Sequence, residues 1–143
     1  MTPETRRAIE ADCTRLIHHY ANLTDAHDWA AIVALYAEGG LMTRPTAPDA
    51  PIIGREALME AFTARPPRIS RHVCANVVVD VTSEIEASAF SVILLFTGAE
   101  AEDGGLPIKG EGAPLVGTYR DKFRKTAEGW RFAERRGALS FRP

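Results

Sequence analysis

Apolar residues in the first part of the chain recur at the three- and four-residue spacing of an amphipathic helix. Thr2-Pro3-Glu4 supplies a hydroxyl N-cap, a first-turn proline and an acid, which together begin a helix. We expect this helix to run to about Leu23. Its buried stripe is predicted to consist of Ile9, Cys13, Leu16, Ile17 and Tyr20.

Two further helices are predicted before the pattern changes. Asp28 can cap a short helix that Gly39-Gly40 ends, and its apolar positions are Trp29, Ile32, Val33 and Tyr36. A third helix is predicted over residues 54–62, with Pro66-Pro67 preventing its continuation. Between these helices, residues 41–44 form a short predicted strand, and residues 45–51, which include three prolines, are predicted to be a loop or lid.

Beyond residue 70 the apolar period changes from 3.6 to 2, which is typical of strands. Long strands are predicted over residues 70–81, 85–97, 115–125 and 130–141. Residues 98–114 are rich in glycine, proline and acids and are predicted to be an exposed linker, while residues 126–129 form a tight hairpin turn. Helices followed by antiparallel strands predict one α+β domain over residues 1–143, with the helices on one face of a curved sheet.

Composition narrows the classes of function. The 143 residues are 45% hydrophobic and 25% charged, the average for a soluble globular protein. No apolar run approaches the ~18 residues of a membrane span, and the charged start lacks the apolar core of a signal peptide. We therefore predict a cytoplasmic protein with no membrane partner, and the isolated Cys13 and Cys74 fit a reducing compartment. The net charge of −2 argues against nucleic acid as the main partner.

Charge is unevenly distributed along the strands. Residues 84–111 contain six acids and one base, whereas residues 119–143 contain eight bases and three acids. Two neighbouring strands with complementary solvated faces would explain this pattern. An anionic substrate or an acidic partner is the alternative.

Few residues are candidates for chemistry. The four histidines show neither the HxxxH nor the HExxH spacing of a metal site, and no glycine-rich phosphate loop occurs, so neither metal nor cofactor is expected. Tyr20, Asp25 and His72 remain, together with Trp29 and the late arginines. A histidine oriented by a carboxylate is a simple general base, and a phenol can donate a hydrogen bond to an oxygen that gains charge. The first three also have structural interpretations. Tyr20 can pack in the core, Asp25 can cap a turn, and His72 can form a hydrogen bond at the end of a strand.

Three segments carry a family resemblance: TRLIHHYANLTDAHDWAAIVALYAEGG, RHVCANVVVDV and GTYRDKFRKTAEGWRFAERR. They resemble the SnoaL-like branch of the nuclear-transport-factor-2-like (NTF2-like, cystatin-like) superfamily. The resemblance implies a cone-shaped α+β barrel, with three N-terminal helices against a strongly curved, mainly antiparallel sheet and an apolar cavity between them. It also implies a homo-oligomer, either a dimer or a trimer.

Enzymes of this family include scytalone dehydratase, bile-acid 7α-dehydratase, hexachlorocyclohexane dehydrochlorinase and polyketide cyclases. By position in the motifs, the resemblance implies an Asp25–His72 pair, a cavity tyrosine at Tyr20 and a cavity arginine at Arg135. Substrate-pocket residues are predicted at Trp29, Tyr36 and Phe62.

These residues predict a cofactor-independent lyase or isomerase, dehydratase- or cyclase-like, acting on a small hydrophobic cyclic molecule. In this interpretation His72 removes a proton, Asp25 orients it, and Tyr20 and Arg135 stabilise the group that gains charge. A non-catalytic ligand-binding or assembly module, similar to a dioxygenase β subunit, is the alternative.

Strand alternation leaves the directions of two of these side chains open. On a regular strand His72 shares a face with Cys74, Asn76, Val78 and Asp80, opposite an unbroken apolar stripe. If that stripe lines the cavity, His72 faces outward unless a bulge intervenes. If the stripe packs on a partner subunit, His72 faces inward. The same question applies to Arg135, because on a regular strand Arg136, and not Arg135, shares a face with Trp130 and Phe132.

Overall fold

The computed structural model describes residues 1–99, 103 and 105–142. Within these residues the chain forms three helices and six strands. In chain order they are α1 (Pro3–Asp25), α2 (Trp29–Ala34), β1 (Tyr36–Arg44), β2 (Ala47–Ile53), α3 (Arg55–Thr63), β3 (Ile69–Val81), β4 (Glu86–Gly98), β5 (Gly110–Thr126) and β6 (Gly129–Leu139). None of the helices in this described part combines the length and apolar character that crossing a membrane requires.

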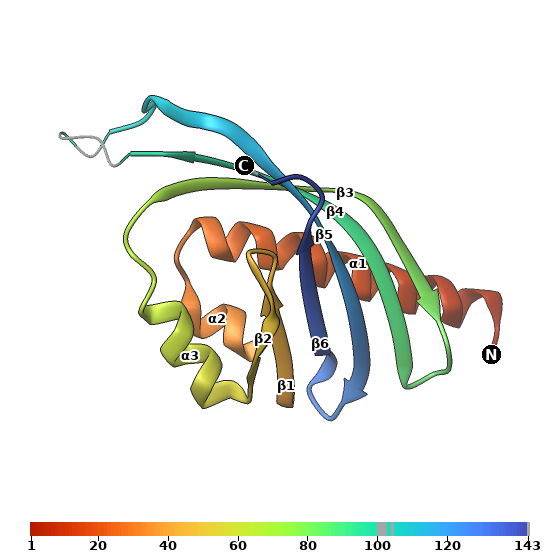
Figure 1. Cartoon of the computed structure of the whole chain (residues 1–143). Helices are drawn as coiled ribbons and strands as arrows, with labels where there is room; N and C mark the ends of the chain where they lie inside the picture. Colours follow the sequence, from red (N-terminus) through yellow and green to blue (C-terminus); the bar gives the residue numbers. More distant parts are fainter. Residues whose placement is uncertain (100–102, 104, 143) are drawn as a thin grey trace.

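The strands form a single curled sheet in the order β2-β1-β6-β5-β4-β3. β1 and β6 are parallel, and the other neighbours are antiparallel. The sheet bends around α1, while α2 and α3 lie near its β1–β2 end (Figure 1). The predicted α+β class and cone-like curvature are confirmed, although β2 and β3 are free edges and the sheet does not close.

Helix α1 begins where the sequence predicts and ends two residues later, at Asp25. The Thr2 side chain accepts a hydrogen bond from the Thr5 N–H, which satisfies one of the helix's free donors. His27 follows the helix with φ 56°, and this left-handed residue turns the chain so that Asp28 caps α2. The turn leaves Asp25 at the end of α1, beside the start of β3.

Several predicted boundaries were wrong. Helix α2 ends at Ala34, so Tyr36 begins β1, and Gly39-Gly40 lie inside that strand rather than ending the helix. The reason is tertiary: β1 pairs with the distant strand β6, and this pairing prevails over the local helical pattern. The predicted strand over residues 41–44 is therefore the second half of a longer one.

The predicted loop or lid over residues 45–51 contains most of β2, which begins at Ala47. This strand carries two prolines and pairs only with β1, and an edge strand tolerates residues that cannot donate a hydrogen bond. The linker predicted over residues 98–114 is also shorter, because β5 begins at Gly110. Residues 100–102 and 104 of that linker lie outside the described residues.

A bulge in β3 changes the direction of its side chains. Ala75 pairs with Val92 and Val78 with Phe90, so β3 has one residue more than β4 over this stretch. Asn76 lies in the bulge with φ 52°. Before it, His72 and Cys74 face the interior; after it, the inward residues are Val77, Val79 and Val81. Val73 and Val78 are 41% and 57% exposed on the outer face. The apolar stripe is thus split between the two faces.

A second bulge in β6 has the same effect on its side chains. Lys122 pairs with Glu134 and Phe123 with Phe132, so Ala133 is an extra residue. Phe132 and Arg135 consequently both face inward, with exposed fractions of 0% and 1%. The side chain of Arg136 is 48% exposed, so Arg135 is the interior arginine.

Arg135 forms a buried ion pair with Asp121 of β5. Its Nε lies 3.3 Å from Oδ1 of Asp121, and both side chains are almost fully buried. Burial raises the pKa of Asp121 to about 6, against the opposing effect of Arg135. Burial also disfavours the charge on Arg135, but the carboxylate of Asp121 keeps the pKa of this arginine above its ordinary value. Arg135 therefore stays charged inside the fold.

Replacing Asn76 with valine should lower the free energy of unfolding by about 1–2 kcal/mol, because a β-branched side chain is disfavoured at positive φ. Urea titration measures this loss. The matched control is Asp80→Val, at an exposed position of the same strand, which should stay within about 0.5 kcal/mol of the wild type. Equal losses in the two variants would show that the bulge is not responsible.

Replacing Asp121 with leucine should destabilise the fold by about 3–5 kcal/mol, because the buried charge of Arg135 loses its partner. The double variant Asp121→Leu/Arg135→Met should recover most of the loss. Glu134→Gln, which breaks the partly exposed pairs with Lys122 and Arg136, should cost no more than about 1 kcal/mol. Thermal or urea unfolding measures all three. A double variant no more stable than Asp121→Leu would argue against a charge effect.

Candidate functional site

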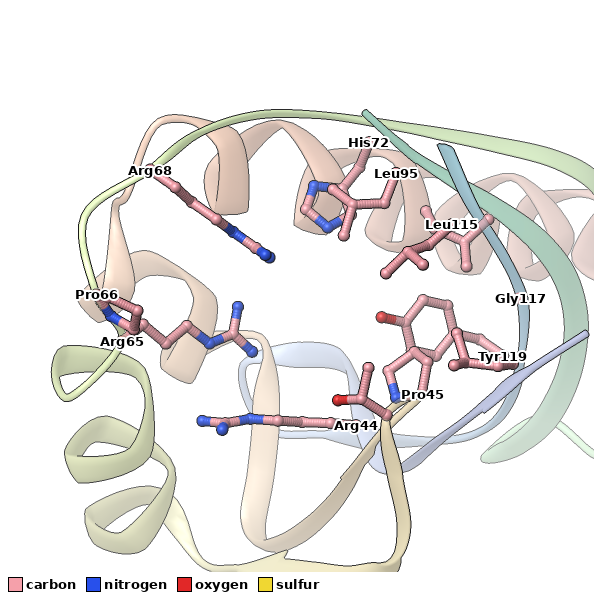
Figure 2. Close-up of a pocket in the computed structure, with 13 residues that line it drawn as sticks. Arg44, Pro45, Arg65, Pro66, Arg68, His72, Leu95, Leu115, Gly117 and Tyr119 are labelled. Atoms are coloured by element: carbon pink, nitrogen blue, oxygen red, sulfur yellow. The ribbon is translucent and has the colours of Figure 1, made fainter. Parts of the chain in front are cut away.

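A cavity of about 250 Å³ opens between the inner face of the sheet and the segments that follow β1 and α3. A smaller hollow of about 30 Å³ shares several of its walls and extends to Tyr20 and Arg135. Figure 2 shows the larger cavity with the ring of His72 at one side and the Tyr119 hydroxyl directed into it. The larger cavity is lined by Arg44, Pro45, Thr46, Arg65, Pro66, Arg68, His72, Ile93, Leu95, Leu115, Gly117, Tyr119 and Leu139.

Asp25 and His72 are in direct contact. Nδ1 of His72 lies 2.6 Å from Oδ1 of Asp25, and the backbone N–H of His72 donates to Oδ2 over 2.8 Å. The Ser70 hydroxyl also donates to Oδ1, over 2.9 Å. The side chains of Asp25 and His72 are only 5% and 11% exposed. The carboxylate therefore receives hydrogen bonds from three donors and fixes both the position of the ring and the start of β3.

The ionisation of Asp25 follows from these contacts. Partial burial raises its pKa, but the hydrogen bonds from the His72 side chain and backbone and from Ser70 outweigh burial, and the pKa lies below its ordinary value. Asp25 is therefore ionised at neutral pH and accepts a hydrogen bond from the Nδ1–H of His72. In this tautomer Nε2 carries the free lone pair, and His72 lines the cavity.

Tyr20 and Tyr36 form a buried pair of phenols behind the cavity. Their hydroxyl oxygens are 2.8 Å apart, and Tyr20 also donates to Sδ of Met42 over 3.5 Å. Burial raises the pKa of Tyr20 to about 12, so this phenol is neutral at physiological pH. Tyr20 lines the smaller hollow, where its single O–H can donate to a ligand only by leaving Met42, whose sulfur is a weak acceptor.

Arg135 lies between two aromatic rings. Its guanidinium carbon is 4.3 Å from the ring centre of Tyr20 and 3.9 Å from that of Tyr119. Nη2 of Arg135 is buried and has no hydrogen-bond partner among the described residues. Arg135 lines the smaller hollow, so its cationic side chain borders the space that a ligand would enter.

The structure brings together the four residues suggested for catalysis. His72 lines both cavities, Tyr20 and Arg135 line the smaller one, and Asp25 lies directly behind His72. They come from three elements, with Tyr20 and Asp25 on α1, His72 on β3 and Arg135 on β6, and the two bulges turn His72 and Arg135 inward.

The three residues predicted to line a substrate pocket are placed differently. Tyr36 and Phe62 are fully buried in the core and line neither cavity. Tyr36 begins β1 instead of ending α2, which points its hydroxyl at Tyr20. Trp29 stacks on Phe62 and lines a separate hollow of about 10 Å³. The residues that line the larger cavity therefore differ from the three pocket residues that the sequence predicts.

Of the residues that line the larger cavity, the sequence predicted only His72; those that it missed include three arginines and a tyrosine, Arg44, Arg65, Arg68 and Tyr119. The sequence offered one signal for two of them, because Arg65 and Arg68 flank the Pro66-Pro67 pair that ends the third helix. No local pattern marks the other two. In the part of the chain that the structure describes, no group of three or more histidine, cysteine or acidic side chains could hold a metal ion.

Several solved structures are similar to this fold. A candidate scytalone dehydratase from Novosphingobium aromaticivorans DSM 12444 has a TM-score of 0.79 at 21% identity, covering 98% of this chain and 89% of that chain. A type 2 hexachlorocyclohexane dehydrochlorinase (LinA) has a TM-score of 0.80 at 12% identity, covering 98% and 90%. An NTF2-like protein with a cystatin-like fold, also from Novosphingobium aromaticivorans, has a TM-score of 0.69 at 24% identity, covering 96% and 82%. At these identities the likeness establishes the fold alone.

Sequence comparison gives a more specific result. No curated protein matches the chain. The SnoaL-like domain, in contrast, matches residues 5–136 and so spans most of the sequence. The chain therefore belongs to the SnoaL-like domain family.

Proposed function

We propose that the protein is a cofactor-independent lyase or isomerase that removes a proton from a small cyclic substrate, with dehydration as the first choice of reaction. One observation carries the proposal: Asp25 holds Nδ1 of His72 at 2.6 Å, and the same ring lines the cavity. A partly buried imidazole in this tautomer has Nε2 available as a general base. The similarity to structures described as a candidate dehydratase and a dehydrochlorinase supports the choice of elimination.

The proposed reaction begins with a proton next to a carbonyl group. Nε2 of His72 takes this proton, and the electrons of the C–H bond form an enolate. The neutral phenol of Tyr20 and the unpartnered Nη2 of Arg135 supply hydrogen-bond donors for the charge that develops. When the enolate collapses to a C=C bond, the C–O bond of a β-hydroxyl breaks. The proton on His72 moves to the departing oxygen, which leaves as water.

Isomerisation or cyclisation would use the same first step. In isomerisation the proton returns to another carbon of the enolate, and in cyclisation the enolate carbon attacks an electrophilic carbon of the same molecule. The apolar wall formed by Ile93, Leu95, Leu115 and Leu139 can accept a ring in either case. These reactions are second to dehydration because they require a substrate with a further reactive carbon.

Replacing His72 with alanine should reduce turnover by at least about 100-fold and leave the fold intact. The assay uses cyclic ketones of one and two rings that carry a β-hydroxyl group and follows the absorbance of the enone product. Incorporation of solvent deuterium next to the carbonyl reports proton removal even when no group leaves. The matched control is His19→Ala, at an exposed position of α1, which should keep full activity. A folded, active His72→Ala protein would overturn the base assignment. Binding without either reaction would favour the non-catalytic alternative.

Replacing Asp25 with asparagine should lower kcat by about 10²–10⁴-fold. The carboxylate accepts hydrogen bonds at both oxygens, whereas an amide can accept at only one. If its NH₂ faces the ring, the His72 proton moves to Nε2 and the base is lost. Conservation of kcat together with an unchanged pH profile would contradict a positioning role for Asp25.

The same variant tests the lowered pKa of Asp25 through stability. A carboxyl group whose pKa is lower in the folded than in the unfolded protein stabilises the fold at pH values above the pKa that it has in the unfolded protein. This stabilisation is lost as the pH falls through the pKa that the group has in the folded protein. The difference in free energy of unfolding between wild type and Asp25→Asn should therefore shrink as the pH falls below about 4. Urea titrations across this range measure it, and a pH-independent difference would contradict the assignment.

A further inference from the structure

Three arginines line the larger cavity on the side opposite the sheet's apolar wall. Arg44 is the last residue of β1, and Arg65 and Arg68 lie in the segment between α3 and β3. In Figure 2 the side chains of Arg65 and Arg68 extend toward the space that His72 and the Tyr119 hydroxyl also face. One wall of the cavity is therefore cationic, whereas the proposed reaction by itself requires only the base and the donors described above.

The positive charge of these arginines is not compensated locally. None of the three pairs with a carboxylate of the described residues, and no aspartate or glutamate is among the residues lining either cavity. Arg44 donates from Nη2 to the Ala61 carbonyl over 2.9 Å, but its buried Nε has no partner among the described residues. Burial and the like charges of Arg44 and Arg68 lower the pKa of Arg65. An anion in the cavity would relieve this repulsion.

Arg65 is held in place before any ligand binds. Its guanidinium carbon lies 4.6 Å from the ring centre of Phe62 and 5.8 Å from that of Trp29. Pro66 and Pro67 follow directly and restrict the backbone of the segment that carries Arg65 and Arg68. A guanidinium fixed in this way loses little conformational entropy on binding, and its planar fork suits the oxygens of carboxylate or phosphate.

We infer that the substrate carries an anionic oxygen group, carboxylate or phosphate, which Arg65 and Arg68 bind while the ring of the substrate lies against the apolar wall beside His72. The placement of the reactive carbon at His72 rests on the proposed function. Recognition of the anion does not, because it depends on charges that are present whether or not His72 acts as a base. The substrate is accordingly an amphipathic ring acid or ring phosphate instead of a wholly apolar molecule.

Calorimetric titration with benzoate, phenyl phosphate and benzamide tests this inference, with 1-naphthoate and 1-naphthamide as two-ring probes. At least one anionic probe should bind about tenfold tighter than the neutral amide with the same number of rings. This preference for the anion should decline as salt is added. The stronger of benzoate and phenyl phosphate identifies the anionic group. Equal affinity of the anions and the amides would overturn the inference.

Variants locate the preference within the protein. Arg68→Met and Arg65→Met should each remove a large part of the roughly tenfold anion preference, whereas Arg65→Lys should keep more of it because the charge remains. The matched control is Arg7→Met, which removes one positive charge from an exposed position of α1 and should leave the preference unchanged. A preference that survives both methionine variants would overturn the assignment to these arginines.

The outcomes separate the two proposals. The anion preference should persist in His72→Ala, since the arginines are untouched. An anion preference without turnover or deuterium exchange in any probe would reject the proposed reaction alone. Turnover of neutral and anionic ring substrates with equal KM would reject the anion site and leave His72 as the base.

Discussion

The side chains of a β-strand alternate between its two faces, and an extra residue is needed to change that phase. The site of this protein depends on two such residues. Without the bulge at Asn76, inward-facing Val77 and Val79 would place His72 on the outer face. Without the bulge at Ala133, Phe132 could not share the interior with Arg135. Each bulge allows one strand to contribute apolar packing at one end and a polar group to the cavity at the other.

Asp25 joins the helical and sheet layers at the point where the cavity opens. Its carboxylate accepts hydrogen bonds from the Ser70 side chain, the His72 backbone and the His72 ring, so the end of α1 is tied to the start of β3. At the other side, Arg135 is held by Asp121 and by the rings of Tyr20 and Tyr119. Both polar groups are therefore fixed by contacts that exist without substrate, which is the preorganisation that proton transfer requires.

Much of this arrangement can be predicted from the sequence, but the parts that depend on pairing cannot. Helical spacing and the Thr2 cap identified α1, the absence of other motifs left Asp25 and His72 as candidates, and the family resemblance paired them and singled out Arg135. The direction of His72 was undecidable because alternation assumes a regular strand, even though asparagine tolerates positive φ better than most residues. Tyr36 was assigned to a helix because its pairing partner β6 lies far along the chain. The cationic wall was missed because its arginines converge only after the chain folds.

The parallel pairing of β1 with β6 also has a consequence for how the cavity comes into being. β3, β4, β5 and β6 are joined in sequence by antiparallel pairing, so they can form from contacts between neighbouring segments. β1 meets β6 only when residues 36–44 close a loop against residues 129–139, which carries a large entropic cost. His72 and Arg135 belong to the first group of strands, whereas Arg44 arrives with β1. We expect the open sheet to fold first and the enclosed, charged cavity to be completed in the last step of chain closure.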